Sequence, residues 1–258
     1  MPKFSACIEM IFRDLPVPDR IAAVASAGVP AFEFWDWRNK DLDAIAEAQR
    51  RHGLALSAFS GVGGHLIPLV EPSSHDRVVE AVRDACGVAR RLDCATLICT
   101  TGNELPDRPR RAQHDAVVAN LRAAAPVAGD HGITLVLEPL NVLVNHAGYY
   151  LVTSREGFEI IDEVGSPHVK LLYDVYHQQI SEGYLTQTIS EHIAQIGHLH
   201  VADTPGRHEP GTGEINYRHI FSVIDAVGYA GYVGLEYRPS GDVAASLRQT
   251  VALSEVGA

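Results

Sequence analysis

Four polar residues that follow apolar runs are the candidates for chemistry in this chain. Glu138 ends the run ITLVLE, Asp174 ends VKLLYD, His200 ends IGHLH and Glu236 ends YVGLE. They are separated by 36, 26 and 36 residues, which places them on four consecutive strands if a helix follows each strand. Adjacent strands lie about 4.8 Å apart, so we expect these four side chains to lie close together.

A divalent metal ion is the simplest reason to collect three carboxylates and an imidazole. Carboxylates this close repel one another, and burying them unpaired is costly. Three carboxylate oxygens and one imidazole suit Mg²⁺, Mn²⁺ or Co²⁺ better than a structural Zn²⁺. Any one of these residues alone has another explanation, as a solvated rim residue or a helix-dipole partner, but four on consecutive strands favour a metal site.

Two further residues lie close to these positions in the sequence. His177 follows Asp174 by three residues, and Arg207 lies in the loop after His200. A guanidinium can hold a carboxylate or polarise a hydroxyl with two coplanar donors. Two other interpretations stay open: His177 as a water-facing residue of a first helical turn, and Arg207 as a surface partner of Glu209.

Short apolar runs alternate with longer amphipathic stretches along the chain, about every 32 residues. Most of the apolar runs have no polar alternation, as expected for parallel strands covered on both faces. The predicted strands are 4–10, 31–35, 54–59, 96–100, 133–138, 168–174, 196–201 and 232–236. The predicted helices are 19–27, 41–52, 73–92, 110–131, 154–164, 176–194, 217–227 and 243–251.

Eight such strand–helix units predict a single (β/α)₈ TIM barrel that comprises residues 1–258 as one domain. An open doubly wound sheet usually has a G-x-G-x-x-G turn after its first strand, whereas this chain has Ile11-Phe12-Arg13-Asp14. Active sites of TIM barrels lie at the C-terminal ends of the strands, which is where the four candidate residues are expected.

Four residues in or just after the first two predicted strands carry weaker signals. Glu9 lies in CIEM and Glu33 in AFEFW. We expect both to lie far around the barrel from the four strand-end residues, as pocket-rim residues or internal polar partners. Trp35 and Trp37 are equally compatible with the apolar wall of a pocket and with core or loop positions.

Composition restricts the class of protein further. The chain has 258 residues, 46% of them hydrophobic, a net charge of −11 and a pI near 5.6. These values exclude a disordered chain and argue against nucleic acid or an anionic membrane as partner. The sequence shows neither a secretory signal nor a run of about 20 apolar residues. Four scattered cysteines suit a reducing cytoplasm and buried, unreactive thiols.

Several segments resemble the hydroxypyruvate isomerase family, which belongs to the xylose isomerase-like barrels together with the ketose 3-epimerases. The matching segments are FSACIEMIF, LEPLN, LLYDVYHQQISEG, IGHLHVADTPGRHEPGTGEINY and GYVGLEYRP. The resemblance runs from end to end and is most specific at GRHEPGTGEINY.

The resemblance implies a role for each candidate residue. Glu138, Asp174, His200 and Glu236 would bind one divalent metal, Mg²⁺ or Mn²⁺ with Co²⁺ as a further candidate. Glu138 and Glu236 would also act as acid and base on opposite sides of the substrate. His177 and Arg207 match substrate-binding positions. The small-molecule substrate would be a hydroxy-keto acid or a ketose, and the family suggests a homo-oligomer.

The implied reaction is an aldose–ketose isomerisation, such as hydroxypyruvate to tartronate semialdehyde. A metal accepts the charge that develops when a proton leaves the carbon beside a carbonyl, giving an enediolate. One glutamate removes that proton and the pair returns it to the adjacent carbon. If the proton returns to the same carbon from the other face, the same site is a 3-epimerase.

The resemblance weakens after the third predicted strand. Family members carry a longer segment there with a basic cluster, whereas residues 57–74 are Gly-rich and contain no Arg or Lys. Basic residues there would meet a substrate carboxylate, so a 2-oxo-tetronate or a neutral ketose stays open as substrate. His65 is a possible replacement donor.

Two other functions for such a barrel are less compatible with the sequence. A phosphodiester-cleaving barrel needs a three-zinc cluster with more histidine ligands and a basic surface. A sugar-binding barrel without catalysis does not need two opposed glutamates beside a metal.

Overall fold

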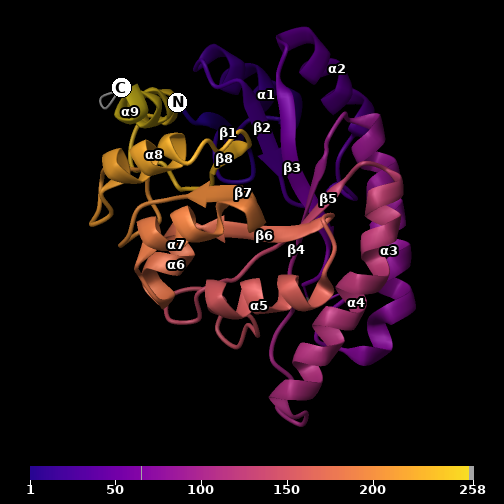
Figure 1. The fold of residues 1–258 in the computed structure, drawn as a ribbon. Helices are drawn as coiled ribbons and strands as arrows, with labels where there is room; N and C mark the ends of the chain where they lie inside the picture. The colour runs from indigo at the N-terminus through magenta and orange to yellow at the C-terminus, as the bar shows by residue number, and fades with distance from the viewer. Residues whose placement is uncertain (65, 256–258) are drawn as a thin grey trace.

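Eight parallel strands close into a barrel in the computed structural model, which describes residues 1–64 and 66–255 (Figure 1). Each strand pairs with its neighbour in chain order, and the first closes against the last. The predicted (β/α)₈ TIM barrel is therefore confirmed. The strands are β1 (Lys3–Cys7), β2 (Ala31–Phe34), β3 (Ala55–Val62), β4 (Thr96–Cys99), β5 (Thr134–Leu137), β6 (Val169–Asp174), β7 (Ile196–Val201) and β8 (Tyr232–Leu235).

Helices connect the strands and cover the outside of the barrel (Figure 1). The α-helices are α1 (Val17–Ser26), α2 (Leu42–His52), α3 (His75–Arg91), α4 (Arg110–Asp130), α5 (Ser154–Val164), α6 (Val175–Ser181), α7 (Leu185–His192), α8 (Tyr217–Ala226) and α9 (Val243–Glu255). Two short 3₁₀ helices are η1 (Pro72–Ser74) and η2 (Ile193–Gln195).

Local signals define the ends of these helices, as α2 shows. The side chain of Asp41 accepts hydrogen bonds from the N–H groups of Asp43 and Ala44, at 3.1 and 3.0 Å. Gly53 ends the helix at φ +66°, a left-handed conformation that a residue without Cβ adopts easily. Between these ends, Ile45 and Ala48 are buried. A short segment with a cap, an apolar stripe and a glycine stop thus packs one face on the barrel.

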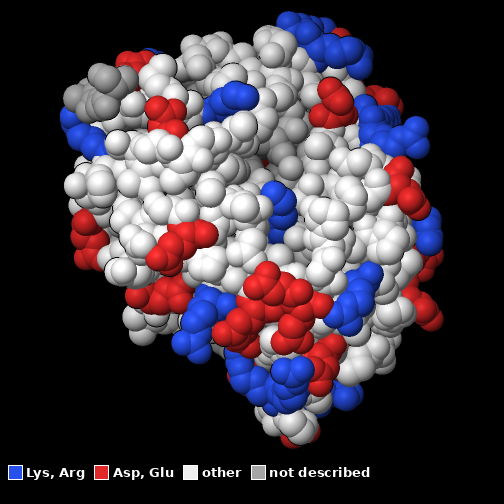
Figure 2. All heavy atoms as spheres, in the orientation of Figure 1, with Lys and Arg blue, Asp and Glu red and all other residues white. Residues whose placement is uncertain are grey.

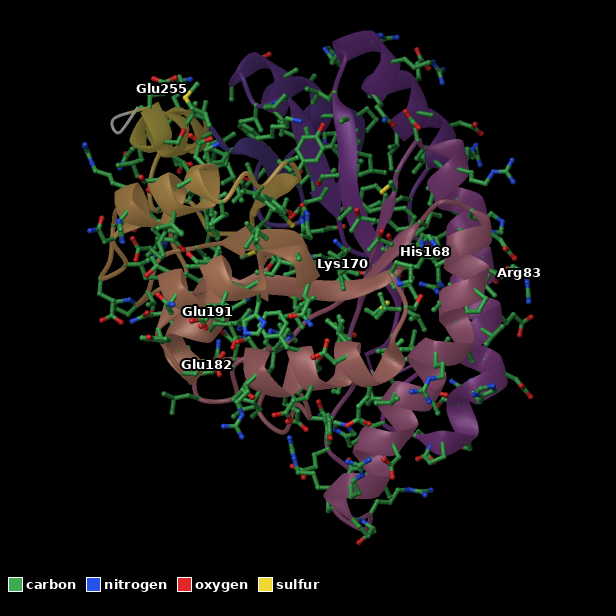
Figure 3. The ribbon with its side chains drawn as sticks, viewed as in Figure 1. Arg83, His168, Lys170, Glu182, Glu191 and Glu255 are labelled. Atoms are coloured by element: carbon green, nitrogen blue, oxygen red, sulfur yellow. The ribbon has the colours of Figure 1, made fainter. Side chains whose placement is uncertain are left out.

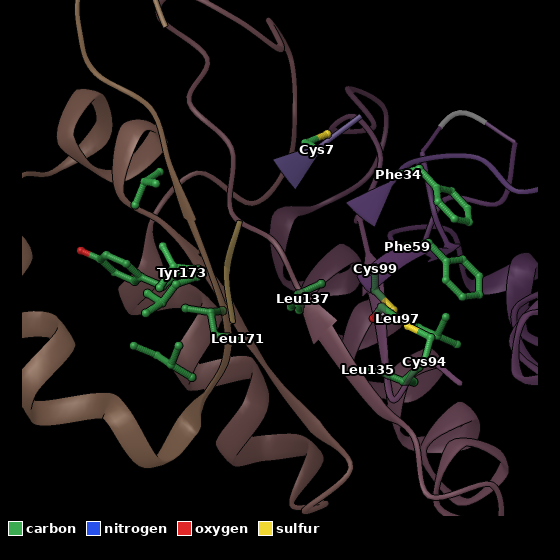
Figure 4. Close-up of a cluster of buried hydrophobic side chains, with 14 of the residues drawn as sticks. Cys7, Phe34, Phe59, Cys94, Leu97, Cys99, Leu135, Leu137, Leu171 and Tyr173 are labelled. Atoms are coloured by element: carbon green, nitrogen blue, oxygen red, sulfur yellow. Dashed lines mark hydrogen bonds between the residues drawn. The ribbon is translucent and has the colours of Figure 1, made fainter. Parts of the chain in front are cut away.

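The main core lies between the strands and the surrounding helices (Figure 4). In it the rings of Phe34 and Phe59 stack with centroids 5.4 Å apart. A second, small apolar cluster of Ala58, Ile98, Val136 and Leu172 comes from the consecutive strands β3 to β6. The two clusters together cover both faces of these strands, as their unbroken apolar sequences predict.

Polar side chains of the barrel interior come mainly from the other strands, with Ser57 of β3 beside them. Ser5 of β1, Glu33 of β2 and His198 of β7 are all at most 2% exposed, and Ser57 is 5% exposed. His168 and Lys170 mark the beginning of β6 in Figure 3, whereas Asp174 is the last residue of that strand. The interior is therefore apolar on one side and polar on the other.

Several predicted elements have other bounds in the structure: β3 continues to Val62 and α9 to Glu255. Two elements differ more strongly. The first strand ends at Cys7 rather than residue 10, because the carbonyl of Cys7 accepts hydrogen bonds from the N–H groups of Met10 and Ile11 in a turn. The helix predicted over 176–194 is divided into α6 and α7. Gly183 and Tyr184 separate them with φ angles of +68° and +56°, which a right-handed helix does not allow.

The structure also bears on the cysteines and on membrane-spanning segments. Cys7, Cys86, Cys94 and Cys99 are all free and buried, and burial raises the pKa of Cys94 and of Cys99 to about 12, as expected for unreactive thiols. Within residues 1–64 and 66–255, no helix has the length and apolar character needed to cross a membrane.

Candidate active site

The predicted site residues meet at the C-terminal end of the barrel. Glu138 and Glu236 directly follow β5 and β8, and their N–H groups still bond to the neighbouring strands, at Cys99 O (3.0 Å) and Val201 O (3.2 Å). This continued pairing fixes the direction of both side chains. Ligand atoms of Glu138, Asp174, His177 and Glu236 all lie within 4.8 Å of one another. We call this group, together with His200 Nδ1, the mouth cluster.

His200 contributes one ring nitrogen to the mouth cluster. Its Nδ1 lies 3.5 Å from Glu138 Oε1 and 3.5 Å from Glu236 Oε2. Its other nitrogen, Nε2, points into the barrel and lies 3.0 Å from Glu33 Oε1. Burial acts to lower the pKa of His200, but the charges of Glu33 and Glu236 outweigh it and raise this pKa well above 6.5.

Asp174 both caps a helix and faces the mouth cluster. Its Oδ1 accepts hydrogen bonds from the N–H groups of Tyr176 (2.8 Å) and His177 (3.2 Å), which begin α6. Its Oδ2 lies 3.6 Å from His177 Nε2. One oxygen is thus fixed by the backbone, and the other faces the cluster.

The hydrogen bonds of His177 determine its tautomer. Its Nδ1 accepts from the backbone N–H of Asn141 (3.1 Å) and from the side-chain Nδ2 of Asn141 (2.7 Å). The Asn141 Oδ1 accepts from two other N–H groups, so the amide orientation is determined as well. Burial and the positive charge of Arg207 lower the pKa of His177 well below 6.5. His177 is therefore neutral and presents Nε2–H, a donor suited to a substrate oxygen rather than to a metal.

The two glutamates have different surroundings. Glu236 Oε1 accepts from the indole N–H of Trp35 at 2.7 Å, and its Oε2 accepts from Arg207. Glu138 Oε1 is buried and has no hydrogen-bond partner within the described part of the chain. Burial alone would raise the pKa of both carboxyls. It raises that of Glu138 to about 7, whereas Arg207 and His200 reverse the effect at Glu236 and hold its pKa far below 4.5.

Arg207 reaches the site from a rigid loop between β7 and α8. Asp203 holds this loop by accepting backbone hydrogen bonds from Thr204 (2.9 Å), Gly211 (2.8 Å) and Ile215 (3.2 Å). A Cβ on Gly213 would lie only 2.5 Å from Asp203 Oδ1, so a glycine is required there. These contacts explain why the distinctive segment GRHEPGTGEINY positions a guanidinium beside Glu236.

Glu33, Trp35 and Asn141 contact the site in ways that the sequence does not predict. The expected position of Glu33, far around the barrel from the site, is wrong: its carboxylate contacts His200 because the closed barrel brings β2 and β7 together across the interior. Its expected role as an internal polar partner is correct, because it is 2% exposed and bonded to His198 and Ser57. The contact of Trp35 with Glu236 was missed, and so was Asn141, which the LEPLN segment could have indicated.

The mouth cluster is suited to a divalent metal ion because two of its ligand atoms lack hydrogen-bond partners among the described residues. Glu138 Oε1 and His200 Nδ1 are buried, and no described residue forms a hydrogen bond with either. Leaving such groups unpaired away from water is costly. A cation among these carboxylates and the imidazole removes that cost, and the oxygen-rich donor set suits Mg²⁺ or Mn²⁺.

A cavity of about 350 Å³ lies at the C-terminal ends of β2, β3 and β4. Trp35, Ser60, Gly63 and Thr100 line it, and Arg38 contributes to its wall. Trp35 joins the cavity to the mouth cluster through its bond to Glu236. The cavity is large enough for a molecule of a few carbon atoms. His65, the other donor suggested for this region, lies outside the described residues.

Comparison with known proteins assigns the chain to a family. A family model described as a xylose isomerase-like TIM barrel matches residues 21–253. The chain belongs to this family. A 2-oxo-tetronate isomerase from Pectobacterium atrosepticum is 35% identical to this xylose isomerase-like barrel over 246 residues, which are 93% of this chain and 94% of the relative. A hydroxypyruvate isomerase from Escherichia coli is 35% identical over 257 residues, which are 96% and 98% of the two chains.

Solved structures agree with this assignment. A protein from Brucella melitensis described as an AP endonuclease of family 2 is 33% identical, with a TM-score of 0.92 over 98% of this chain and 99% of its own. An L-ribulose 3-epimerase has the same fold, with a TM-score of 0.84 at 23% identity over 100% and 94% of the chains. The resemblance to the hydroxypyruvate isomerase family is confirmed, and the xylose isomerase-like barrel is an isomerase that acts on a small molecule.

Proposed function

We propose that the chain is a metal-assisted aldose–ketose isomerase of a small hydroxy-keto acid, of the hydroxypyruvate to tartronate semialdehyde type. The observation that carries this proposal is the placement of two carboxylates around one imidazole. Glu138 Oε1 and Glu236 Oε2 each lie 3.5 Å from His200 Nδ1, and Asp174 Oδ2 faces the same cluster. A carboxylate within reach of two adjacent carbons can carry a proton between them, and a second carboxylate gives the site another acid/base group for the same substrate.

Glu138, Asp174, His200 and Glu236 are the residues that would hold the metal, which we propose to be Mg²⁺ or Mn²⁺, with Co²⁺ as a further candidate. When bound, such an ion supplies positive charge to the carbonyl and hydroxyl oxygens of the substrate, where negative charge develops during proton transfer. His177 is excluded from this ligand set by its tautomer, because its Nδ1 accepts two hydrogen bonds and its Nε2 carries the proton.

The two glutamates share the proton transfer. Glu138 and Glu236 both end strands at the barrel mouth, and Arg207 and Trp35 hold the Glu236 carboxylate by hydrogen bonds. One glutamate removes the proton from the substrate carbon, and the pair returns it to the adjacent carbon. At the same time the proton of the substrate hydroxyl moves to the former carbonyl oxygen, so the isomerisation balances.

His177 and Arg207 bind and orient the substrate. His177 Nε2–H is buried with no acceptor among the described residues, so it is free to donate to a substrate oxygen. The Nε–H of Arg207 is equally buried and free, while its terminal nitrogen holds Glu236. A substrate oxygen that contacts both donors is fixed relative to the base, which reduces the entropic cost of the reaction.

The substrate is a short 2-oxo acid in this proposal. The two similar isomerases are named for hydroxypyruvate and 2-oxo-tetronate, and both names denote carboxylates. Residues 57–74 contain no Arg or Lys, but Arg38 lines the adjoining cavity. One terminal nitrogen of Arg38 pairs with Asp36 at 3.2 Å, and we propose that its other donors meet a substrate carboxylate. Epimerisation of free ketoses at the third carbon is the alternative activity of the same two-glutamate site.

A substrate panel tests the proposal. Hydroxypyruvate, 2-oxo-tetronates, ketopentoses and ketohexoses are compared by kcat/KM with the Mn²⁺-loaded protein. We expect an acid to exceed every neutral ketose by at least tenfold, with one solvent deuterium incorporated at the carbon that receives the proton. Faster turnover of a ketose, with inversion at its third carbon, would replace isomerisation by epimerisation.

DNA cleavage, which the name of the Brucella protein suggests, is less compatible with this chain. Binding a phosphate backbone depends on many Lys and Arg side chains. The net charge is −11, and Figure 2 shows acidic and basic side chains interspersed on the face shown. Location in the cytoplasm and assembly into a homo-oligomer stay predictions.

A further inference from the structure

We propose that Glu33 is a positioning residue, which holds the ring of His200 in the orientation and tautomer that direct Nδ1 to the metal. Glu33 lies on β2, is 2% exposed, and places Oε1 3.0 Å from His200 Nε2. The inference rests on the proposed metal site, but it concerns a residue that contacts neither substrate nor metal.

The Glu33 carboxylate is itself fixed by its neighbours. Its Oε2 accepts from Ser57 Oγ at 3.0 Å and lies 3.0 Å from His198 Nε2. Ser57 is in turn bonded to Ser5 Oγ at 2.5 Å. These groups come from β1, β2, β3 and β7, so four strands determine where the carboxylate lies. We call Glu33, His198, Ser57 and Ser5 the interior cluster.

The sequence of β8 leaves space for this contact. Gly234 lies on the barrel wall beside the pair, and a Cβ built on it would be 2.4 Å from Glu33 Oε1 and 2.6 Å from His200 Cδ2. Side-chain atoms do not approach this closely, so any larger residue displaces the carboxylate or the ring. A glycine inside a short strand is unfavourable unless something needs its space, and the Glu33–His200 pair fills that space.

The tautomer of His200 follows from this contact. Glu33 Oε1 and His200 Nε2 lie at ion-pair distance, 3.0 Å, and neither forms an aligned hydrogen bond with a described residue. Because a carboxylate only accepts hydrogen bonds, a neutral His200 ring in this position carries its proton on Nε2. When a metal is bound the ring is neutral, and the lone pair is then on Nδ1, the atom 3.5 Å from Glu138 and Glu236. A carboxylate behind a metal-binding histidine fixes the ring and makes it a stronger ligand, and losing it commonly weakens metal binding 10–100-fold.

Mn²⁺ binding to the Glu33→Gln variant tests the inference without any substrate. We expect the Kd for Mn²⁺, measured by calorimetry, to increase about 10–100-fold. Glu9→Gln is the matched control, because Glu9 lies just after β1, pairs with Lys40 of the β2–α2 loop at 2.5 Å and is not part of either cluster. Its Kd should equal that of the wild type. An unchanged Kd in Glu33→Gln, with Mn²⁺ bound normally by the wild type, overturns the inference and leaves the proposed function intact.

A double-mutant cycle separates positioning from general structural support. In a His200→Ala background, Glu33→Gln should weaken Mn²⁺ binding by less than twofold further, because the group that Glu33 positions is gone. Equal weakening in both backgrounds would show that Glu33 supports the barrel rather than His200. Gly234→Ala should weaken binding about tenfold by crowding the same pair, and only in the presence of His200.

The wild-type protein offers a readout that needs no variant. In Mg²⁺-loaded protein labelled with ¹⁵N-histidine, we expect His200 to be protonated at Nε2 and unprotonated at Nδ1. The opposite tautomer would contradict the inference. If the wild type binds neither Mn²⁺ nor Mg²⁺, the metal site of the proposed function fails, and the inference fails with it.

Discussion

At the barrel mouth, Glu138 Oε1 and His200 Nδ1 are buried without a hydrogen-bond partner among the described residues, whereas Glu33 Oε2 in the interior accepts from two neighbours. Both clusters combine carboxylates and imidazoles, and members of both are almost fully buried. The clusters differ in how their members are held rather than in residue type. Among the described residues, Glu33 Oε1 and His200 Nε2 also lack an aligned hydrogen bond, but they face each other at 3.0 Å, and Glu33 Oε2 is bonded on two sides. At the mouth the shortest contacts of His200 Nδ1 with the two glutamates are 3.5 Å, which leaves these atoms available to a ligand.

His200 of the mouth cluster also contacts the interior cluster, through its other ring nitrogen. Nε2 faces Glu33 in the interior, and Nδ1 faces Glu138 and Glu236 at the mouth. The comparison therefore predicts that changes at the mouth abolish chemistry, while changes in the interior weaken metal binding or stability.

Removal of the metal should have the largest effect. Exhaustive chelation should abolish turnover, because three buried carboxylates and an imidazole then have no cation to organise them, and added Mn²⁺ or Mg²⁺ should restore it. Atomic emission confirms the metal content of each sample. Full activity in a demonstrably metal-free sample would show that the reaction does not need a metal.

Substitution of either glutamate by glutamine should lower kcat by about 10²–10⁴-fold, the usual contribution of a general acid or base. Glu138→Gln and Glu236→Gln keep the size of the side chain and one oxygen, so Mn²⁺ binding should weaken only in part. Steady-state kinetics and calorimetry on the same preparations separate the two effects. Turnover near the wild-type rate in either variant would refute its assignment as acid or base.

The difference between the two glutamates also predicts opposite effects of pH on the stability of metal-free protein. The pKa of Glu138 is raised to about 7 in the folded protein, against 4.5 when unfolded. The contribution of Glu138 to the unfolding free energy is therefore fully present below pH 4.5 and is lost as the pH rises through 7. The loss is up to about 3 kcal/mol. Glu236, with a lowered pKa, contributes stability above pH 4.5 that is lost on acidification.

Urea unfolding at pH 5.5 and pH 8 measures this difference. Glu138→Gln should be more stable than the wild type at pH 8 and similar to it at pH 5.5, whereas Glu236→Gln should be less stable than the wild type at pH 8. If Glu138→Gln lowered stability equally at both pH values, burial of the ionised Glu138 carboxylate would not be the cause of the pH dependence.

The smallest effect is expected within the interior cluster, at its far end. Ser5→Ala removes the hydroxyl that bonds to Ser57 and should cost about 1 kcal/mol of unfolding free energy. Because Glu33 keeps its contacts with His198 and His200, the Kd for Mn²⁺ should not change. A changed Kd would show that the interior transmits small displacements to the mouth.

The sequence predicts the mouth cluster well because its members end apolar strands of one parallel barrel. Regular spacing of Glu138, Asp174, His200 and Glu236 is enough to place them together. It cannot place Glu33 beside His200, because that contact crosses the interior and depends on which way β2 and β7 face. The tautomer of His177 depends on Asn141, 36 residues earlier, and no spacing rule contains that hydrogen bond.

The break between α6 and α7 shows a local limit of the same kind. Gly183 is visible in the sequence as a possible stop, but Tyr184 adopts a left-handed conformation that a bulky residue rarely takes. Tertiary packing around residues 183–184 outweighs the local preference there. Prediction succeeded where periodicity alone determines position, and failed where side chains from distant strands do.

Anomalous diffraction from crystals grown with Mn²⁺ would locate the metal itself. We expect one strong manganese peak at the barrel mouth, within bonding distance of carboxylate oxygens of Glu138, Asp174 and Glu236 and of His200 Nδ1. Glu33 should remain on His200 Nε2 in the same crystals. A peak bound by His177, a peak among Glu33, His198 and His200, or no peak in the barrel would contradict the account.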